Sequence, residues 1–344
     1  MIDALQDLSG PTSVWGNAVE EGLELGIDKI NSEGGVNGKK LELIVYDVKL
    51  DAQEAITAYN RLVDQDKVVA VAGPPISGIG LALAAVAEEK GVPTVGSFMD
   101  PRCTVSEDGV LLNYMFLMQP STVQYAEILA DYALKELGIN KMAVFYDQSN
   151  AYVVSLVGPF KEYVKNNGGS IDAEEVYKKD DKDFKTQLNK IKEAGVEALF
   201  APNYIQDSVL TVQQADQIGL DITIIGAFDY APPFASTLSD PELVDDIYFA
   251  NNYLNADPKL KELRDVYFEK YGEEPINKVF LGYDKILIIA DALKRAGSEE
   301  PTAIKDALEK VSNLQCTTGI ITISPNTHSP VGLSMVIFKM ERYL

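Results

Sequence analysis

The chain has 344 residues but only one histidine, one tryptophan and two cysteines. Cys103 and Cys316 lack the spacing of a metal site, so they form at most one disulfide or remain two free thiols. Gly-x-Gly-x-x-Gly and the Walker-type Gly-rich loop are also missing, which argues against the usual dinucleotide and nucleoside triphosphate sites. We therefore expect neither a cofactor nor a metal.

The scarcity of histidine makes an enzyme the least favoured class of function. His328 lies in the polar turn SPNTHSP, residues 324–330, far along the chain from any nucleophile-elbow motif. A Ser-His-Asp triad would depend on that one turn residue. We expect no catalytic residues.

Basic residues are also few, 30 against 52 acidic ones, and the formal charge is −22. The electrostatic field of this negative net charge repels phosphate backbones, so nucleic acid is not an expected partner. The acidic residues are scattered over predicted helices and are interpreted as a solvated surface. No apolar run approaches the ~18 residues that cross a bilayer.

Hydrophobic patterning predicts two βα series of similar size. Short strands rich in Val and Ile alternate with amphipathic helices up to about residue 100, and the rhythm restarts after residue 122. Two doubly wound lobes accommodate these strands better than one very wide sheet. Later helices, predicted near 258–271, 277–296 and 301–312, have no third core to join and must complete these lobes. Segments 319–324 and 332–340 predict a terminal hairpin.

Three successive βα loops carry small residues, hydroxyls and free backbone N–H groups. They are SGPTSVWG (9–16), GPPISG (73–78) and SFMD (97–100). In open α/β sheets ligands bind beyond the carboxyl ends of the strands, where helix N-termini favour anions. The loops therefore predict a site for one small anion such as a carboxylate.

Several segments, in order along nearly the whole chain, resemble one known family. They are DLSGPTSVWG (7–16), INSEGGVNGKKLELIVYD (30–47), AGPPISG (72–78), KGVPTVGS (90–97), MAVFYD (142–147), FLGYDKILIIADALKRAG (280–297) and TGIITISP (318–325). With these motifs the chain resembles the type I periplasmic binding proteins, specifically the branched-chain amino-acid (Leu/Ile/Val-type) solute-binding proteins of ABC importers.

The resemblance implies an α/β fold of two Rossmann-like lobes joined by three hinge crossings. We assign residues 1–119 with 251–320 to the N-terminal lobe and 120–250 with 321–344 to the C-terminal lobe. The resemblance also implies a monomer that captures a small ligand by closing a cleft and then delivers this ligand to a membrane permease. We expect an extracytoplasmic protein, periplasmic or lipid-anchored, whose leader is absent from this chain.

On the first lobe, the family's carboxylate-binding serine and the adjacent backbone N–H correspond to Ser77 and Gly78. The next loop contributes Phe98 to Asp100, and an aromatic wall corresponds to Trp15. On the second lobe the resemblance implies Tyr152, Tyr204 and an acidic partner for a ligand ammonium group within GAFDY (226–230), which contains Asp229 and Tyr230.

Three positions depart from the family pattern. Phe228 stands where the acid usually sits, Asp100 where threonine is frequent, and Leu117 where arginine is frequent. The ammonium partner is therefore Asp100, Asp229 or neither. The expected ligand is a branched-chain or other apolar or aromatic amino acid. An aromatic carboxylate without an amino group, or a role as the ligand-binding domain of a receptor or regulatory sensor, is the alternative.

Overall fold

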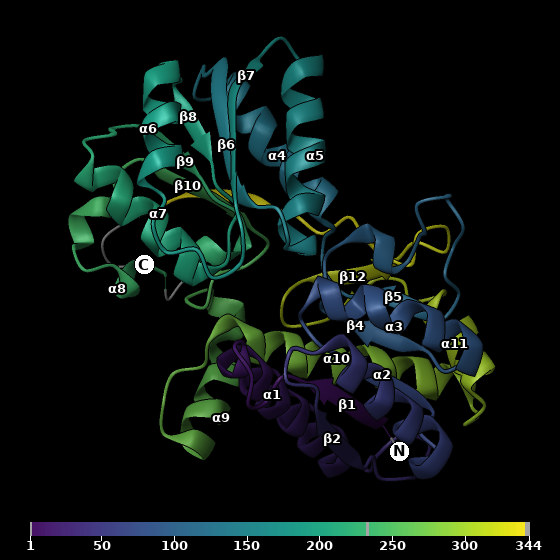
Figure 1. Cartoon of the computed structure of the whole chain (residues 1–344). Coiled ribbons are helices and arrows are strands. Elements are labelled where there is room, and N and C mark those ends of the chain that lie inside the picture. The colour runs from purple at the N-terminus through teal and green to yellow at the C-terminus, as the bar shows by residue number, and fades with distance from the viewer. Residues whose placement is uncertain (1, 232–233, 341–344) are drawn as a thin grey trace. The chain divides into compact units, whose positions relative to one another are not determined.

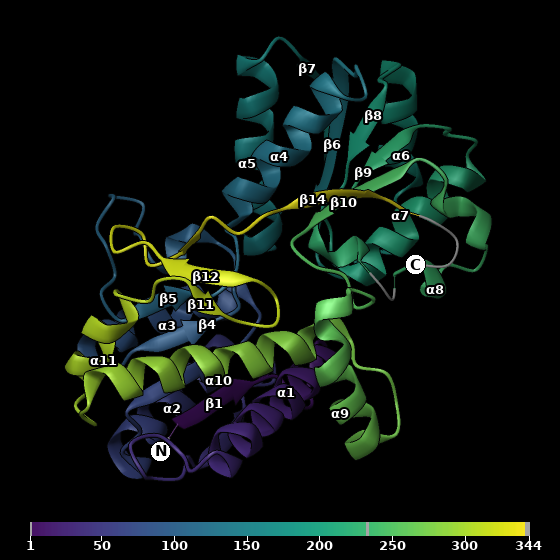
Figure 2. The same ribbon diagram turned by 180° about the vertical axis from the view of Figure 1, so that it is seen from behind.

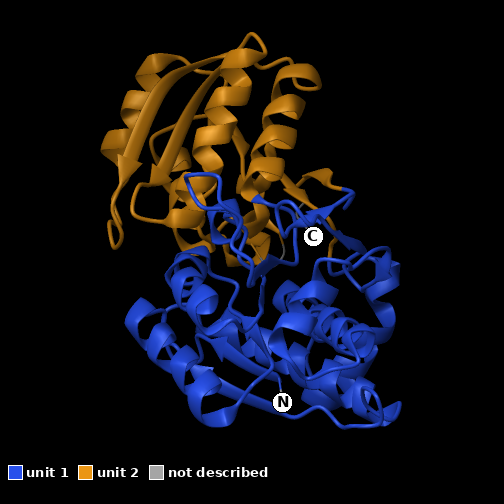
Figure 3. Cartoon of the chain, turned by 90° about the vertical axis from the view of Figure 1, so that its right-hand side faces the viewer, with its two compact units in different colours: residues 1–121, 255–334 blue, residues 122–254, 335–344 orange. Residues whose placement is uncertain are grey.

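The computed structural model describes residues 2–231 and 234–340, and the chain forms two compact units (Figure 3). Unit 1 comprises residues 1–121 and 255–334, and unit 2 comprises residues 122–254 and 335–344. The chain therefore passes from one unit to the other three times. Within the described residues no helix is long and apolar enough to cross a membrane.

Unit 1 is built on a five-stranded parallel sheet in the order β2-β1-β3-β4-β5 (Figure 1). All residues of β1, β3, β4 and β5 are buried, which agrees with the mostly apolar sequence of these strands; Asp3 and Gln6 of β1 are buried polar exceptions. The strands are β1 (Ile2–Gln6), β2 (Leu43–Asp47), β3 (Ala70–Gly73), β4 (Thr94–Gly96) and β5 (Met115–Leu117).

Six α-helices of unit 1 lie within the described residues. Helix α10 is predominantly buried, and it lies alongside α1 although the two are far apart in sequence (Figure 2). The helices are α1 (Ser13–Ser32), α2 (Ala52–Arg61), α3 (Ser77–Lys90), α9 (Lys261–Tyr271), α10 (Asn277–Ala296) and α11 (Pro301–Leu308).

Glycines allow α1 and α10 to approach backbone to backbone. A Cβ atom on Gly22 would lie 2.0 Å from the Val279 carbonyl oxygen, and one on Gly282 would lie 2.1 Å from the Val19 carbonyl oxygen. Both distances are far below van der Waals contact, so neither position accepts a side chain without a shift of the helices. This contact joins the two distant parts of the sequence that make up unit 1.

Unit 2 contains a six-stranded sheet in the order β14-β10-β9-β8-β6-β7, parallel except for β14 (Figure 2). Its strands are β6 (Lys141–Asp147), β7 (Ser170–Tyr177), β8 (Ala198–Phe200), β9 (Thr223–Ile225), β10 (Ile247–Asn251) and β14 (Val336–Lys339). Its helices are α4 (Thr122–Lys135), α5 (Ala151–Asn166), α6 (Lys185–Ala194), α7 (Ile205–Gln217) and α8 (Phe234–Thr237). The predicted α/β fold with two doubly wound lobes is confirmed.

The predicted terminal hairpin is wrong. Strand β12 (Ile320–Ile323) pairs with β11 (Leu314–Gln315) and β13 (Pro330–Val331) in a small antiparallel sheet of unit 1, whereas β14 pairs with β10 in unit 2. Residues 321–334, assigned from the sequence to the C-terminal lobe, therefore lie in unit 1. The pairing partners are remote or very short strands, which local patterning does not reveal.

The side chain of His328 is buried, although Pro325, Asn326 and Thr327 before it in the turn are exposed. The imidazole stacks on Phe116 with ring centroids 4.1 Å apart, and its Nδ1 lies 3.1 Å from the Met115 carbonyl oxygen. Burial lowers the pKa of His328 although Glu309 lies 3.2 Å from Nε2. This histidine attaches the turn to β5. The two cysteines, both in unit 1, are free thiols.

Candidate ligand-binding site

Two buried or half-buried carboxylates hold the loop between β1 and α1. Asp7 accepts hydrogen bonds from the N–H groups of Gly10 (2.7 Å) and Thr12 (2.8 Å) and from the Thr12 hydroxyl (2.6 Å). Asp47, at the end of the neighbouring strand, accepts one from the Ser9 hydroxyl at 2.5 Å. The small residues of this loop thus allow the backbone to fold tightly around Asp7.

This loop leads into the first turn of α1, which carries Trp15. The indole is partly buried, and the Nζ atom of Lys278, in the first turn of α10, lies 5.0 Å from its ring centroid. This distance is typical of a cation–π contact. The aromatic side chain predicted as a wall of the ligand site therefore carries a cation on its face.

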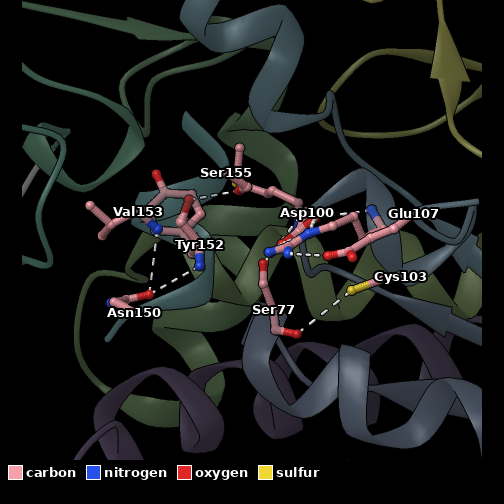
Figure 4. Close-up of polar contacts among 10 residues, drawn as sticks. Ser77, Asp100, Cys103, Glu107, Asn150, Tyr152, Val153 and Ser155 are labelled. Atoms are coloured by element: carbon pink, nitrogen blue, oxygen red, sulfur yellow. Dashed lines mark hydrogen bonds and ion pairs between the residues drawn. The ribbon is translucent and has the colours of Figure 1, made fainter. Parts of the chain in front are cut away.

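The loop between β3 and α3 places Ser77 at the first position of the helix. Its Oγ accepts hydrogen bonds from the backbone N–H groups of Met99 and Asp100, both at 3.2 Å, and its carbonyl accepts from the Cys103 thiol (Figure 4). The Ser77 hydroxyl can still donate its own proton. Gly78 is exposed, and no atom lies within 4 Å of where its Cβ would be. The N-terminus of α3 is therefore open to an anion.

In the loop after β4, the side chains of Phe98 and Asp100 are already engaged within unit 1. Phe98 is buried, and its ring occupies the space that Cβ atoms on Gly80 and Gly96 would need. The fully buried Asp100 carboxylate is bound by Arg102 through Nη2 (2.7 Å) and Nε (3.1 Å). This partner raises the pKa of the Arg102 guanidinium. Asp100 already has a cation, which makes it a weak candidate for a ligand ammonium group.

In unit 2 the residues after β6 and β8 form a tyrosine pair. Tyr152 lies in the first turn of α5, where its N–H donates to the capping side chain of Asn150 at 3.1 Å (Figure 4). Tyr204 precedes α7, and the two rings stack with centroids 5.7 Å apart. Both tyrosines thus follow the strands that flank the switch point of this sheet.

Asp229 lies in the loop after β9, and its charge acts on several tyrosines. Burial is the main cause that raises the pKa values of Tyr125, Tyr152 and Tyr204, and the negative charge of Asp229 is the second. The same charge also raises the pKa of Tyr230. Asp229 itself is partly exposed. The structure therefore brings one accessible carboxylate close to these aromatic side chains.

The tyrosine hydroxyls differ in their partners. Tyr230 donates to the Ala201 carbonyl oxygen at 2.9 Å and is part of the unit 2 core. The Tyr125 hydroxyl is buried and makes no hydrogen bond within the described part of the chain, whereas the buried Tyr152 hydroxyl interacts with Asp229, which contributes to its raised pKa. The sequence analysis did not identify Tyr125, because its position on α4 is indistinguishable from that of a core residue.

The open surface pocket of unit 1 lies away from these loops. It is formed by α1, β2 and α9, and its carboxylates Glu24 and Asp28 both pair with Lys270 at 3.2 Å. We assign it no ligand. Among the described residues no group of three or more histidine, cysteine or acidic side chains could hold a metal ion.

A family model for periplasmic binding proteins matches residues 2–342. The chain belongs to this family. Its relatives place it with the type I proteins of branched-chain amino-acid transporters. A Leu/Ile/Val-binding protein homologue of Brucella abortus is 27% identical over 328 residues, which covers 90% of this chain and 80% of the relative.

Two solved structures illustrate the range of ligands in this family. The branched-chain amino acid transporter substrate binding protein LivJ of Streptococcus pneumoniae, in complex with isoleucine, is 29% identical with a TM-score of 0.88, covering 99% of this chain and 96% of that chain. An ABC transporter solute binding protein of Rhodopseudomonas palustris, in complex with 3,4-dihydroxy benzoic acid, is 25% identical with a TM-score of 0.86, covering 99% and 92%.

Proposed function

We propose that this periplasmic binding protein is the extracytoplasmic solute-binding component of an ABC importer and captures an amino acid. One observation carries the proposal: the two units present complementary groups at equivalent sheet edges. Unit 1 offers the Ser77 hydroxyl and the exposed Gly78 backbone at the α3 N-terminus, which suits a carboxylate. Unit 2 offers Asp229 among tyrosines, which suits an ammonium group.

Capture would proceed by closure. In this mechanism the ligand docks on unit 1, and the residues of unit 2 then engage its other end. The ligand stabilises the closed state by its differential affinity for it, and the permease recognises that state. Trp15, Tyr152 and Tyr204 would exclude water from the bound ligand, while Phe98 and Tyr230 would support the loops from the cores. The protein would act as a monomer.

A carboxylate without an amino group is the second candidate ligand. The neighbour in complex with 3,4-dihydroxy benzoic acid favours it, as does the aromatic Phe228 at the position where the family usually has an acid. Such a ligand would bind through the α3 N-terminus alone and would not require Asp229. A sensor role would use the same site and differs only in the partner that reads it.

A thermal-shift panel on refolded, ligand-stripped protein tests the proposal. A ligand at ~100 times its dissociation constant adds about 2.7 kcal/mol of stability. We expect an increase in Tm with at least one amino acid. A response only to aromatic acids would support the second candidate. A response only to nucleotides would contradict the binding of amino acids and carboxylates altogether.

A further inference from the structure

A lysine in the core of unit 1 holds the start of the loop that carries Ser77. The Lys285 side chain, on α10, is 0% exposed, and its Nζ donates a hydrogen bond to the Gly73 carbonyl oxygen at 2.6 Å. Gly73 is the last residue of β3, and helix α3 begins at Ser77. The side-chain amide of Gln6 donates to the same carbonyl at 3.4 Å. Two buried donors therefore fix the direction in which the chain leaves β3.

The segment between Gly73 and Ser77 has little conformational freedom of its own. Pro74 and Pro75 follow Gly73 directly, and each proline ring fixes its own φ angle. A proline also restricts the backbone of the residue before it, which here applies to Gly73 and Pro74. A rotation at the Gly73 carbonyl is therefore passed on to Ser77 and to the open N-terminus of α3, because the segment between them cannot absorb it.

Lys285 has no ion pair among the described residues. Its ammonium group can donate three hydrogen bonds, and the described chain provides one acceptor, the Gly73 carbonyl. The neighbouring Asp284 is also buried, but its carboxylate already accepts hydrogen bonds from the backbone and hydroxyl groups of Thr317 and Thr318 at 2.7–2.8 Å. Burial is the main cause that lowers the pKa of Lys285 to about 7, and the charge of Lys278 is the second. Both the ammonium form and the neutral amine are therefore populated near neutral pH.

The charged groups on the surrounding elements have other partners. Strands β3 and β4, which pack against α10, carry no titratable side chain. On β1, Asp3 accepts a hydrogen bond from the Ile44 N–H of β2. Glu20 of α1 lines the surface pocket, and Lys278 of α10 lies over Trp15. The remaining pairs on α1, α10 and α11 are Glu21 with Tyr267, Glu24 and Asp28 with Lys270, Lys29 with Glu33, Asp291 with Arg295, and Lys305 with Asp306 and Glu309. No anion of the described chain therefore pairs with Lys285.

We propose that Lys285 is a positioning residue for ligand binding: its ammonium form holds the segment from Gly73 to Ser77 in the geometry that binds a carboxylate, so that ligand capture is coupled to protonation of Lys285. The anion that the core lacks is the ligand carboxylate itself, bound at Ser77 and Gly78 at the other end of the same short segment. This inference rests on the proposed function. It adds a dependence of affinity on pH, which the groups at the α3 N-terminus alone do not require.

The direction of the coupling follows from electrostatics. A bound carboxylate lowers the cost of the ammonium form and so raises the pKa of Lys285 from about 7. At pH 7.5 the complex should therefore take up protons from the buffer. Affinity should fall as the pH rises from 6 to 8, because the free protein then carries the ammonium form less often. A lysine that only fills space in the core would show neither effect.

The experiment is isothermal titration calorimetry of refolded, ligand-stripped protein, at pH 7.5 in two buffers with different ionisation enthalpies and then at pH 6 and pH 8. The ligands are L-leucine, L-phenylalanine, L-glutamate and 3,4-dihydroxybenzoate. For each ligand that binds, we expect net proton uptake and at least 3-fold weaker binding at pH 8 than at pH 6. Binding of an amino acid with neither effect would overturn the inference and leave the proposed function intact. If 3,4-dihydroxybenzoate alone binds, with both effects, amino-acid capture fails and the inference holds. If no ligand binds, both fail.

Three variants separate positioning from simple packing. K285M keeps a similar volume in the core and should lose at least 10-fold in affinity at pH 6, together with the proton uptake and the pH dependence. K285R keeps a donor that stays charged, so it should restore most of the affinity without the pH dependence. K294M, exposed near the end of the same helix, is the matched control and should behave like the parent. The Tm of each ligand-free variant shows whether it is folded. If folded K285M keeps the affinity or the pH dependence of the parent, the inference is wrong.

Discussion

Units 1 and 2 place their candidate site residues after equivalent strands. In unit 1 they follow β1, β3 and β4, and in unit 2 they follow β6, β8 and β9, on either side of the corresponding switch points. The chemistry at these loops nevertheless differs. Unit 1 presents backbone N–H groups and a serine, whereas unit 2 presents tyrosines and Asp229. We propose that one topology thus carries an anion-binding end and a cation-binding end.

The cores of the two units also differ in how they are closed. Unit 1 needs α10, from the late part of the sequence, packed against α1 through glycines. Unit 2 needs one late element, β14, at the edge of its sheet. The predictions below test these two differences, from the largest expected effect to the smallest.

A methyl group at Gly22 should destabilise unit 1 more than any other change considered. In Gly22→Ala the new Cβ would lie 2.0 Å from the Val279 carbonyl oxygen, and the helices must separate. We expect a loss of about 3 kcal/mol or more in the free energy of unfolding, measured by urea denaturation. Gly158→Ala on α5 of unit 2 is the control, because no atom lies within 4 Å of its Cβ position. That variant should gain about 0.5–1 kcal/mol. Similar losses in both would show that the α1–α10 contact is not special.

Removal of the charge at Asp229 tests the cation-binding end. Asp229→Asn should weaken amino-acid binding by roughly 10- to 100-fold, since a hydrogen bond to a charged group contributes about 1.5–3 kcal/mol. Affinity for a matching acid without an amino group should change little. Asp221→Asn, exposed before β9, is the control. Calorimetry measures both affinities, and an undiminished affinity for amino acids in D229N would exclude Asp229 as the ammonium partner.

Loss of the Ser77 hydroxyl tests the anion-binding end. Ser77→Ala should weaken binding of every carboxylate ligand by roughly 1–2 kcal/mol. The N–H groups of Met99 and Asp100 also lose their acceptor, so the Tm of the ligand-free variant is measured in parallel. Ser32→Ala at the exposed end of α1 should change neither quantity. A fall in Tm with unchanged affinity would assign Ser77 to the loop rather than to the ligand.

Asp3 provides the most pH-dependent effect, which vanishes at low pH. This carboxylate is buried in unit 1, and burial raises its pKa to about 7. The folded state therefore binds its proton more tightly than the unfolded state, so this contribution to stability is present at low pH and is lost as the pH rises toward 7 and beyond. Asp3→Asn should be more stable than the parent by about 1–2 kcal/mol at pH 8 and near parity at pH 4. A pH-independent difference would contradict this assignment.

Much of the fold follows from local patterns. The predicted helix 277–296 is confirmed with its bounds as α10, and the predicted alternation of strands and helices is confirmed in both units. Their apolar periodicity and flanking glycines are local signals. The pairing of β14 with β10 was not predicted, because a four-residue strand gives no information about a partner nearly ninety positions away.

The candidate site was predictable only where a loop motif carries it. Ser77 and Gly78 follow from the small residues after β3, and the structure places them at an open helix N-terminus. Lys285 escaped notice because a lysine within an amphipathic helix is normally solvent-exposed. Its burial depends on the close approach of β3 to α10. The position of Asp229 relative to the tyrosines likewise depends on a tertiary arrangement that a one-residue shift in alignment obscures.

The contact between α1 and α10 has a consequence for synthesis. Helix α1 leaves the ribosome early, but the helix that covers its glycine face begins only at Asn277. Because translation adds roughly 5–20 residues per second, the glycine face of α1 remains uncovered for a time on the order of tens of seconds. Strand β14, which completes the sheet of unit 2, follows later still. Neither unit can therefore finish folding while the ribosome is still making the first two hundred and seventy or so residues, and the nascent chain needs protection from aggregation throughout that interval.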